Sequence, residues 1–348
     1  MNQKAPDLKQ AAKNAAYNPK RNWASTAQPF QSHVSADFVE IATYSQDDLI
    51  KKSERFMEEN GFTFLRVSHE DFQKYEKGDK NFSDWLKDYK KQNKIKGQFD
   101  FLVVGPRVKE LTSAERKSKT WERPPSRIID YLGVMFVALK QTRAHKNKQS
   151  LDTLGKAMDA IEQSEETFAI KNLFWEPHKK TKFRGHKSLW MCEPNEDFPY
   201  GVDDSFKVLA EVKIEHEDQM DTDKFTRRFL NTGRETERLH ENFSRLGTPK
   251  SASRVSTHEK EKAEAMTAIG AMLYNRVFTD AGLGRFMNPS LKGDFSALPP
   301  TAILEATKAT IKEYYAKTAA NKTITVLSNM SLFTPKRSQK SAQKNTKS

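Results

Sequence analysis

The sequence predicts an α+β fold, in which a mixed β-sheet is flanked by helices and further helices lie near both ends of the chain. Three runs in the middle of the chain, residues 99–108, 128–139 and 205–214, are rich in apolar and β-branched side chains, as buried strands are. Helical patterns precede, separate and follow these runs. Separate helical and strand regions of this kind are typical of α+β domains.

The chain starts with a polar segment and two helical patterns. Residues 1–33 contain lysines and prolines but no apolar run, so we expect a flexible segment without a signal peptide. Residues 45–60 bring their apolar side chains to one face of a helix, and Gly61 marks its end. Residues 70–93 repeat this pattern with aromatic side chains among many charges, which predicts a second helix.

The middle of the chain alternates strands with a helix. Gly105 and Pro106 close the first apolar run. Residues 150–163 predict a helix between the second and third runs, and short apolar stretches around Phe174 and at residues 188–191 predict two more strands. We therefore expect a mixed sheet with a helical crossover.

Helical patterns dominate the remainder, at residues 222–246, 260–278 and 301–318. The last residues are rich in Lys, Ser, Gln and Asn, which predicts a disordered basic tail. We expect four parts: a flexible N-terminal segment at residues 1–33, the main domain with its N-terminal helices at 34–250, a helical region at 251–330 and the tail at 331–348.

Composition restricts the class of protein. A chain of 348 residues can bury a core of ordinary size, its one cysteine excludes an intramolecular disulfide, and no apolar stretch reaches the roughly 18 residues of a membrane span. We expect a soluble cytoplasmic protein that has no contact with membranes. The formal net charge of +13 favours polyanionic partners such as nucleotides or RNA, although part of it lies in the tail.

Two acids interrupt apolar runs and are the candidate catalytic and metal-binding residues. Asp130 lies in the second run and Glu211 in the third. Burying a carboxylate costs several kcal/mol unless it is paired or bound to a metal. If the two strands are neighbours, the acids can share Mg²⁺, which takes one or two carboxylates and completes its shell with water and phosphates. The alternative is that each acid lies on a solvated face or at a strand end.

Two basic stretches accompany these acids. Residues 107–119 carry Arg107, Lys109 and Lys117 just before Asp130, and phosphoryl transfer needs such cations. Residues 179–190 form a basic loop with interleaved aromatic side chains, on which bases can stack while lysines hold phosphates. The alternatives are a solvated helix face for the first stretch and a surface hairpin, with Trp190 in the core, for the second.

Taken in order, these pieces resemble the synthetase domain of the RelA/SpoT family, which transfers pyrophosphate from ATP to the 3′-hydroxyl of a guanine nucleotide. Residues 105–117 are similar to the family's R-V-K-x-x-x-S-x-x-x-K element, and residues 129–134 to its D-x-x-G-x-R strand. Residues 182–190 are similar to its K-x-x-G-Y-R-S-L-H loop, and residues 211–214 to E-x-Q-I-R-T. The resemblance extends over roughly residues 100–246.

The resemblance implies a nucleotidyltransferase-like sheet and a stand-alone small alarmone synthetase, since both flanks are short. Asp130 would hold Mg²⁺, and Glu211 would activate the attacking hydroxyl or help to hold the metal. ATP would be the pyrophosphate donor, a purine nucleotide the acceptor, and the product an alarmone of the guanosine tetraphosphate kind, as in the stringent response. The nucleotides would be bound by seven residues: Arg107, Lys109, Ser113, Lys117, Lys182, His186 and Lys187.

Several residues depart from the family pattern and leave the acceptor open. Met135 replaces an arginine, His186 a tyrosine that stacks on guanine, Trp190 a histidine, Lys213 a glutamine and Glu215 an arginine. A second hypothesis is therefore pyrophosphorylation of the tRNA 3′ end, which the basic loop and net charge suit. A third is a catalytically inactive protein that binds nucleotide or RNA. The sequence leaves the oligomeric state open, a homo-oligomer included.

Overall fold

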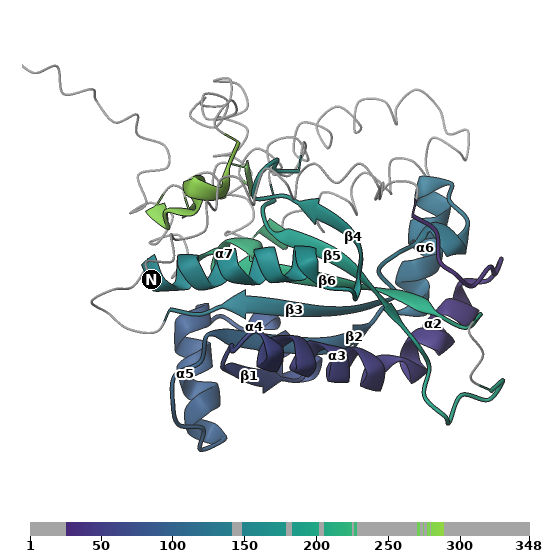
Figure 1. Cartoon of the computed structure of the whole chain (residues 1–348), viewed down its shortest axis with the longest axis horizontal. Helices are drawn as coiled ribbons and strands as arrows, with labels where there is room; N and C mark the ends of the chain where they lie inside the picture. The colour runs from purple at the N-terminus through teal and green to yellow at the C-terminus, as the bar shows by residue number, and fades with distance from the viewer. Residues whose placement is uncertain are drawn as a thin grey trace, which may run out of the picture. The chain divides into compact units, whose positions relative to one another are not determined.

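The computed structural model describes most of the middle of the chain and a short stretch nearer the C-terminus (Figure 1). The chain divides into two compact units, residues 1–225 with 273–297 and residues 226–272 with 298–348. All the helices and strands that the structure delimits belong to the first unit. The described residues are 26–140, 148–178, 183–201, 205–224, 226–227, 270–271, 274, 277–278 and 280–288.

A six-stranded mixed sheet is the centre of the first unit, in the order β1-β2-β3-β6-β5-β4. β1 is parallel to β2 and β3 is parallel to β6, whereas the other neighbours are antiparallel. The predicted α+β fold with a mixed sheet and flanking helices is confirmed. The strands are β1 (Phe64–Val67), β2 (Phe101–Val108), β3 (Leu132–Ala138), β4 (Thr167–Asn172), β5 (His186–Cys192) and β6 (Val208–His216).

One face of the sheet is covered by helices and holds the main core. Successive side chains of a strand point to opposite faces, and Val134, Phe136 and Ala138 of β3 point to this covered face. Buried residues of α2, α3 and α7 pack against them, and Figure 1 shows α3 and α7 in front of the sheet, running roughly along β2 and β3. The helices of this unit are α2 (Ser35–Tyr44), α3 (Gln46–Glu59), α4 (His69–Lys77), α5 (Phe82–Gln92), α6 (Leu111–Trp121) and α7 (Lys148–Gln163).

The opposite face is covered in one half by α4 and α5. Leu102 and Val104 of β2 and Met135 and Val137 of β3 pack there with the aromatic side chains of these helices. Over β6, β5 and β4, the described part of this face carries a small apolar cluster centred on Leu189, and charged side chains lie beside it. We call this half, over β6, β5 and β4, the open half of the sheet.

Two helices stand where the sequence pattern predicted one. The predicted helix at residues 70–93 is interrupted at Gly78, which ends α4, and Asn81 begins α5 by accepting a hydrogen bond from the Asp84 amide at 2.8 Å. Asp221 then joins the two helices, since its carboxylate accepts from the Tyr75 hydroxyl at 3.0 Å and from an α5 amide. The pattern gave the helical faces correctly but overlooked the cap residues between them.

Some elements of the structure were not predicted from the sequence. α2 and the four-residue strand β1 had not been expected, and the strand expected around Phe174 is β4, which ends at Asn172. Phe174 lies in the following turn and is fully buried. Four residues are too few to establish a strand periodicity against the helical signals on either side.

A C-terminal stretch completes the main core. Phe278, Leu283 and Phe286 are buried in it, the last two within a 3₁₀ turn, η4 (Leu283–Phe286), and the ring of Phe278 lies 6.2 Å from that of Phe174. These contacts tie residues 277–288 to the first unit. The predicted helices at residues 222–246, 260–278 and 301–318, the N-terminal segment and the basic tail lie mostly or wholly outside the described residues, and the four-part division stays a prediction.

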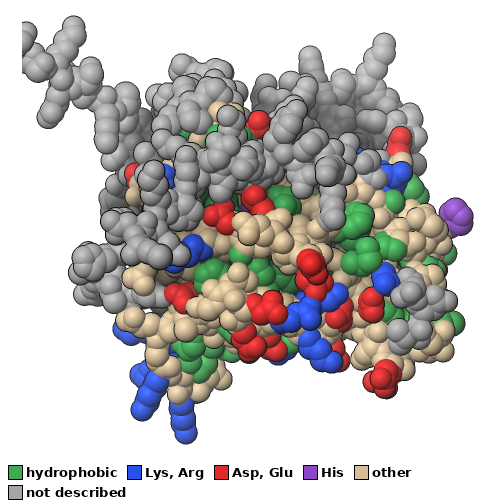
Figure 2. Space-filling model, viewed as in Figure 1, with side chains coloured by type: hydrophobic (Ala, Val, Ile, Leu, Met, Phe, Trp, Pro, Cys, Tyr) green, Lys and Arg blue, Asp and Glu red, His purple; other side chains and the backbone are tan. Residues whose placement is uncertain are grey.

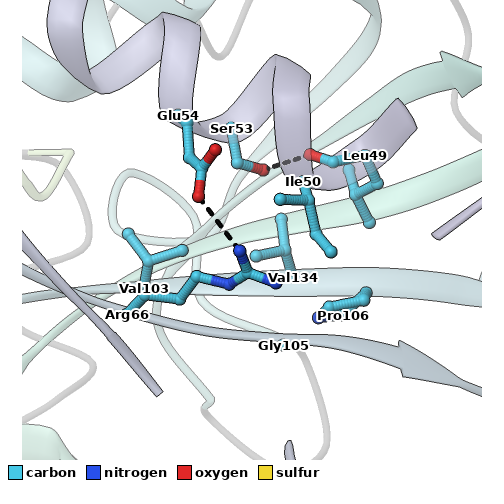
Figure 3. A pocket seen from close by; sticks show the side chains of 9 residues that line it. All are labelled: Leu49, Ile50, Ser53, Glu54, Arg66, Val103, Gly105, Pro106 and Val134. Atoms are coloured by element: carbon cyan, nitrogen blue, oxygen red, sulfur yellow. Dashed lines mark hydrogen bonds and ion pairs between the residues drawn. The ribbon is translucent and has the colours of Figure 1, made fainter. Parts of the chain in front are cut away.

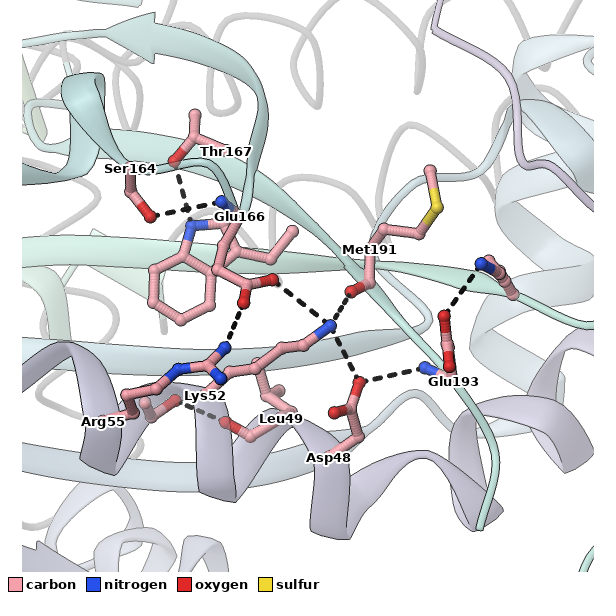
Figure 4. A network of polar contacts seen from close by, with 12 residues as sticks. Asp48, Leu49, Lys52, Arg55, Ser164, Glu166, Thr167, Met191 and Glu193 are labelled. Carbon is pink, nitrogen blue, oxygen red and sulfur yellow. Dashed lines mark hydrogen bonds and ion pairs between the residues drawn. The ribbon is translucent and has the colours of Figure 1, made fainter. Parts of the chain in front are cut away.

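An ion-pair network fixes α3 to the far end of the sheet (Figure 4). The ammonium nitrogen of Lys52 lies 3.1 Å from Asp48, 3.3 Å from Glu166 and 2.7 Å from the carbonyl oxygen of Met191. Arg55 also pairs with Glu166. On the face shown in Figure 2, acidic and basic side chains accordingly intermingle over α3 and do not form a patch of one sign.

None of the described helices is long and apolar enough to cross a membrane.

Candidate active site

Asp130 lies two residues before β3, and this corrects the prediction that it lies within a strand. β3 begins at Leu132, which pairs with Val108 of β2. The preceding residues form a 3₁₀ turn, η2 (Pro125–Arg127), and an irregular stretch, because Pro124 and Pro125 have no amide hydrogen with which to continue a strand ladder. The acid is thus at the entrance of a central strand.

Two lysines hold the Asp130 carboxylate. Lys117 Nζ of α6 lies 2.8 Å from Oδ1, and Lys109 Nζ lies 3.0 Å from Oδ2. Burial acts to raise the pKa of Asp130, but the two ammonium groups outweigh it, so the pKa lies below its ordinary value. Burial, reinforced by the charges of Lys117 and Arg107, lowers the pKa of Lys109 although Asp130 opposes this. Asp130 is therefore ionised at neutral pH.

Glu211 is held in the same way on β6. Lys187 Nζ of β5 lies 3.0 Å from Oε2, and Lys213 Nζ lies 3.5 Å from Oε1. Burial again acts to raise the pKa, and Lys187 and Lys213 overcome it, so the pKa of Glu211 is far below the ordinary value of a carboxyl group. The Glu211 side chain is 15% exposed.

The two carboxylates belong to one electrostatic site. The charge of Glu211 acts to raise the pKa of Asp130, against the stronger effects of the lysines, and Lys117 acts on both acids. Gly133 of β3 pairs with Glu211 across the parallel ladder and is three residues after Asp130 in the chain. A Cβ atom added to Gly133 would lie 3.0 Å from the carbonyl oxygen of Glu211, so the glycine keeps this place clear. β3 and β6 are neighbours, which is the condition under which the sequence allowed the two acids to share Mg²⁺.

Further predicted residues lie beside the Asp130 end of this site. Arg107 of β2 pairs with Gly133 in the antiparallel ladder and is exposed. Ser113 is half-buried in the first turn of α6, four residues before Lys117, and residues at this spacing share one helix face. Lys109 and Lys117 thus contact the Asp130 carboxylate, Arg107 is near enough to act on Lys109, and Ser113 shares a helix face with Lys117.

The structure does not bring His186 into this group. His186 pairs with Ile214, and both point to the covered face. Its ring is fully buried, with Nε2 3.6 Å from Oε1 of Glu162 on α7. Trp190 points the same way and donates to the Thr167 hydroxyl at 3.2 Å, so it is the core residue of the alternative interpretation. Lys182 lies outside the described residues.

Phe183, rather than His186, is the aromatic side chain at the site. Its ring centroid lies 5.6 Å from Lys187 Nζ and 5.9 Å from Lys213 Nζ. The ring also packs edge-on against Tyr274 at 5.8 Å, whose hydroxyl bonds the buried Asp223. The sequence placed Phe183 in the basic loop but gave no means of choosing it over its aromatic neighbours. Glu215, another departure from the family pattern, is fully buried on β6.

A small hollow elsewhere in the structure takes no part in this site (Figure 3). It lies between α3 and the sheet and is lined mainly by apolar side chains, Leu49, Val103 and Val134 among them. Arg66 closes one side through an ion pair of 3.1 Å with Glu54. Val103 and Val134 belong to the main core, so the hollow is on the covered face, whereas Glu211 is on the opposite one.

Mg²⁺ fits the two acids chemically. Among the described residues no group of three or more His, Cys, Asp and Glu side chains could hold a metal ion. Mg²⁺ does not need such a group, because one or two carboxylates together with water and substrate phosphates suffice. A carboxylate has about four lone-pair sites, so the oxygens of Asp130 and Glu211 retain capacity beyond their lysine contacts.

Comparison with known proteins gives likenesses of fold. No protein-family model matches the sequence, and no curated protein is significantly similar to it. Similar solved structures include the small alarmone synthetase 1 from Bacillus subtilis bound to its product pppGpp, with 14% identity and a TM-score of 0.28 over 53% of this chain and 83% of that one.

Two further structures are similar to the same extent. A GTP pyrophosphokinase family protein from Streptococcus pneumoniae has 16% identity and a TM-score of 0.28, over 58% of this chain and 87% of that one. The small alarmone synthetase 2 from Bacillus subtilis has 15% identity and a TM-score of 0.27, over 57% and 89%. Small alarmone synthetases and a GTP pyrophosphokinase family protein are thus among the proteins to which this chain is similar.

Proposed function

We propose that the chain is a Mg²⁺-dependent pyrophosphokinase, which transfers pyrophosphate from ATP to the 3′-hydroxyl of a purine nucleotide, a guanine nucleotide in the first place. One observation carries the proposal: two ionised carboxylates, Asp130 and Glu211, lie in one site and are each held by two lysines. Phosphoryl transfer relies on positioning and on neutralising charge, which such an arrangement supplies. The four motifs in family order support the same chemistry.

The Asp130 end of the site suits the triphosphate of ATP. Lys109 and Lys117 bring two ammonium groups to one carboxylate, and Arg107 and Ser113 lie on the same side. When phosphates enter, these donors can bind them without moving far. Lys109 is 9% exposed, so its contact with a phosphate would be partly shielded from water and correspondingly strong.

Asp130 and Glu211 would hold Mg²⁺, which neutralises charge on the transferring phosphates. The side chains of the site then position the two substrates for the transfer. The 3′-hydroxyl oxygen attacks the β-phosphorus of ATP, the bond from that phosphorus to the α–β bridging oxygen breaks, AMP leaves, and the hydroxyl proton passes to solvent. Because the pKa of Glu211 is so low, Glu211 is a weak base, and we assign it the task of orienting the hydroxyl by accepting its hydrogen bond.

The Glu211 end would then receive the acceptor. Phe183 offers an apolar ring beside Lys187 and Lys213, so a purine can stack on it while the lysines bind phosphate. The terminal adenosine of tRNA is the second candidate acceptor, because lysines beside an aromatic ring also suit an RNA end. Both acceptors present the same hydroxyl to Glu211.

The test is transfer of label by the purified full-length protein. It is incubated with γ-³²P-ATP, Mg²⁺ and, separately, GDP, GTP, AMP, ADP or tRNA, beside Glu211→Gln and a matched control, Glu58→Gln, whose side chain is exposed on α3. We expect label on GDP or GTP with the wild type and the control, and a loss of at least a hundredfold with Glu211→Gln. Label on tRNA alone would make tRNA the acceptor in place of a guanine nucleotide. Binding of ATP without any transfer of label would overturn the proposal.

A further inference from the structure

Three lysines form a row across the open half of the sheet. Lys171 of β4 pairs with Lys187 of β5, and Lys187 pairs with Lys213 of β6. Residues paired in this way share a face, with Cβ atoms about 5 Å apart. The row therefore lies at one level of three adjacent strands, two residues along each strand from the pair of Glu211 and Leu189. Lys171 belongs to none of the four motifs.

Such a row of like charges destabilises the folded protein unless opposite charges compensate it. Like charges directly opposite each other on neighbouring strands are destabilising. Lys187 and Lys213 each contact Glu211, whereas Lys171 is exposed at the end of the row. Burial and the charge of Lys187 lower the pKa of Lys171, and Glu211 only partly opposes this. A ligand that carries several negative charges would relieve the repulsion along the whole row.

We propose that Lys171, Lys187 and Lys213 form a phosphate-binding row for the acceptor, with Lys171 as a specificity-determining residue that reads the presence of consecutive phosphates. The inference rests on the proposed function for the identity of the ligand. The row lies at the Glu211 end, whereas Lys109 and Lys117 hold the Asp130 end, so acceptor and donor phosphates have separate cations. Phe183 stands beside the row, where the acceptor's nucleoside would lie.

The chemistry of the ligand is that of adjacent phosphates on a nucleoside. Lysine side chains are long and flexible, so three that start about 4.8 Å apart from strand to strand can converge on neighbouring phosphate groups. The 5′-diphosphate or triphosphate of a free nucleotide presents such groups, and so does an RNA backbone. A nucleoside monophosphate, with one phosphate, would use the row only in part.

Equilibrium binding to the full-length protein tests the row without any need for turnover. The probes are GMP, GDP and GTP, titrated calorimetrically into the wild type, Lys171→Gln and Lys171→Arg. Lys156→Gln is the matched control, since Lys156 is an exposed lysine on α7. We expect Lys171→Gln to weaken GDP and GTP about tenfold, to change GMP little, and to be rescued by the arginine that restores the charge.

Several outcomes decide the matter. The proposal is overturned if Lys171→Gln binds all three nucleotides as Lys156→Gln does, or if it loses GMP and GTP equally, which would indicate a structural effect. In an RNA arm, tRNA is titrated at several salt concentrations. A weakening confined to tRNA, with a log–log salt slope reduced by about 0.7, would assign the row to RNA phosphates.

These results stand apart from the test of the proposed function. If the wild type transfers label but Lys171→Gln binds nucleotides normally, the proposed phosphate-binding row is rejected and the proposed pyrophosphokinase activity stands. If no label is transferred but the affinity for GTP depends on Lys171, the row stands as a phosphate-binding site and the proposed pyrophosphokinase activity is rejected.

Discussion

Lys117 Nζ of α6 lies 2.8 Å from Oδ1 of Asp130. The same ammonium group acts on the other acid, since with Lys187 and Lys213 it outweighs the effect of burial on the pKa of Glu211. Lys117 therefore connects the two ends of the site, and its removal has consequences for both acids.

Lys117→Gln should weaken ATP binding about tenfold, because a charged donor to the phosphates and to Asp130 is lost. Equilibrium binding of ATP checks this. Lys119→Gln is the control: Lys119 is exposed two residues further along α6, on a different side of the helix. Equal affinities for the two variants would remove Lys117 from the donor site.

Gly133→Ala should impair activity more than folding. The added methyl group would lie 3.0 Å from the carbonyl oxygen of Glu211 and 4.0 Å from its Cβ, so it would displace β6 slightly or push Glu211 aside. We expect at least a tenfold loss in label transfer, since small displacements of reacting groups are costly. Gly284→Ala, with nothing within 4 Å of the new Cβ, is the control. A Gly133→Ala protein with full activity would contradict the idea that this place must be clear.

The stability of the protein should fall as the pH decreases from about 6.5 to 4, in part because of His216. Burial lowers the pKa of His216 to about 4 although Asp218 opposes it, and Nε2 bonds the Ser150 hydroxyl at 3.0 Å. Over this range the unfolded histidine binds a proton that the folded one does not. His216 thus contributes stability above pH 6.5 that is lost on acidification, roughly 3 kcal/mol at most.

The measurement for His216 is the free energy of unfolding by urea at several pH values, for the wild type and His216→Gln. Burial raises the pKa of Asp159 to about 6, which acts in the opposite direction over the same range, so the difference between the two proteins is the informative quantity. That difference should shrink between pH 6.5 and pH 4. A difference independent of pH would show that His216 does not titrate as expected.

Lys52→Met should lower stability by about 1 to 3 kcal/mol without affecting the site. It would remove the ammonium group that contacts Asp48, Glu166 and the Met191 carbonyl from a side chain that is only 16% exposed (Figure 4). Glu166 would keep its pair with Arg55. Urea unfolding measures the loss, and Lys51→Met, at an exposed position of α3, is the control. If both variants were equally stable, the network would not be what fixes α3 to the sheet.

The sequence predicted the parts of the fold that carry long local signals. α3, α7, β2, β5 and β6 lie close to where the apolar patterns placed them. β1 was missed because four residues carry too little pattern. Asp130 was placed inside β3 because the apolar run starts after the two prolines, at residue 128, and does not show that the strand starts only at Leu132.

For the site, the residue types were predictable and their directions were not. Lys187 and His186 are adjacent in sequence, so alternation sends one to Glu211 and the other to α7, and nothing local says which. Register decided the matter, as it also aligned Lys171 with Lys187. Register is set by which residues of two strands pair with each other, and the pattern within one strand does not reveal it.

The place of β6 in the sheet bears on how the protein forms during synthesis. β6 lies between β3 and β5 but follows both in the chain, so it must enter a gap between strands that were made earlier. Until the ribosome has passed residue 216, Asp130 has no partner acid, and β4 with β5 is not joined to the rest of the sheet. Such distant pairing is slow to form. A nascent or truncated chain that ends before β6 would therefore lack the proposed activity, because Asp130 and Glu211 share one site only in the complete sheet.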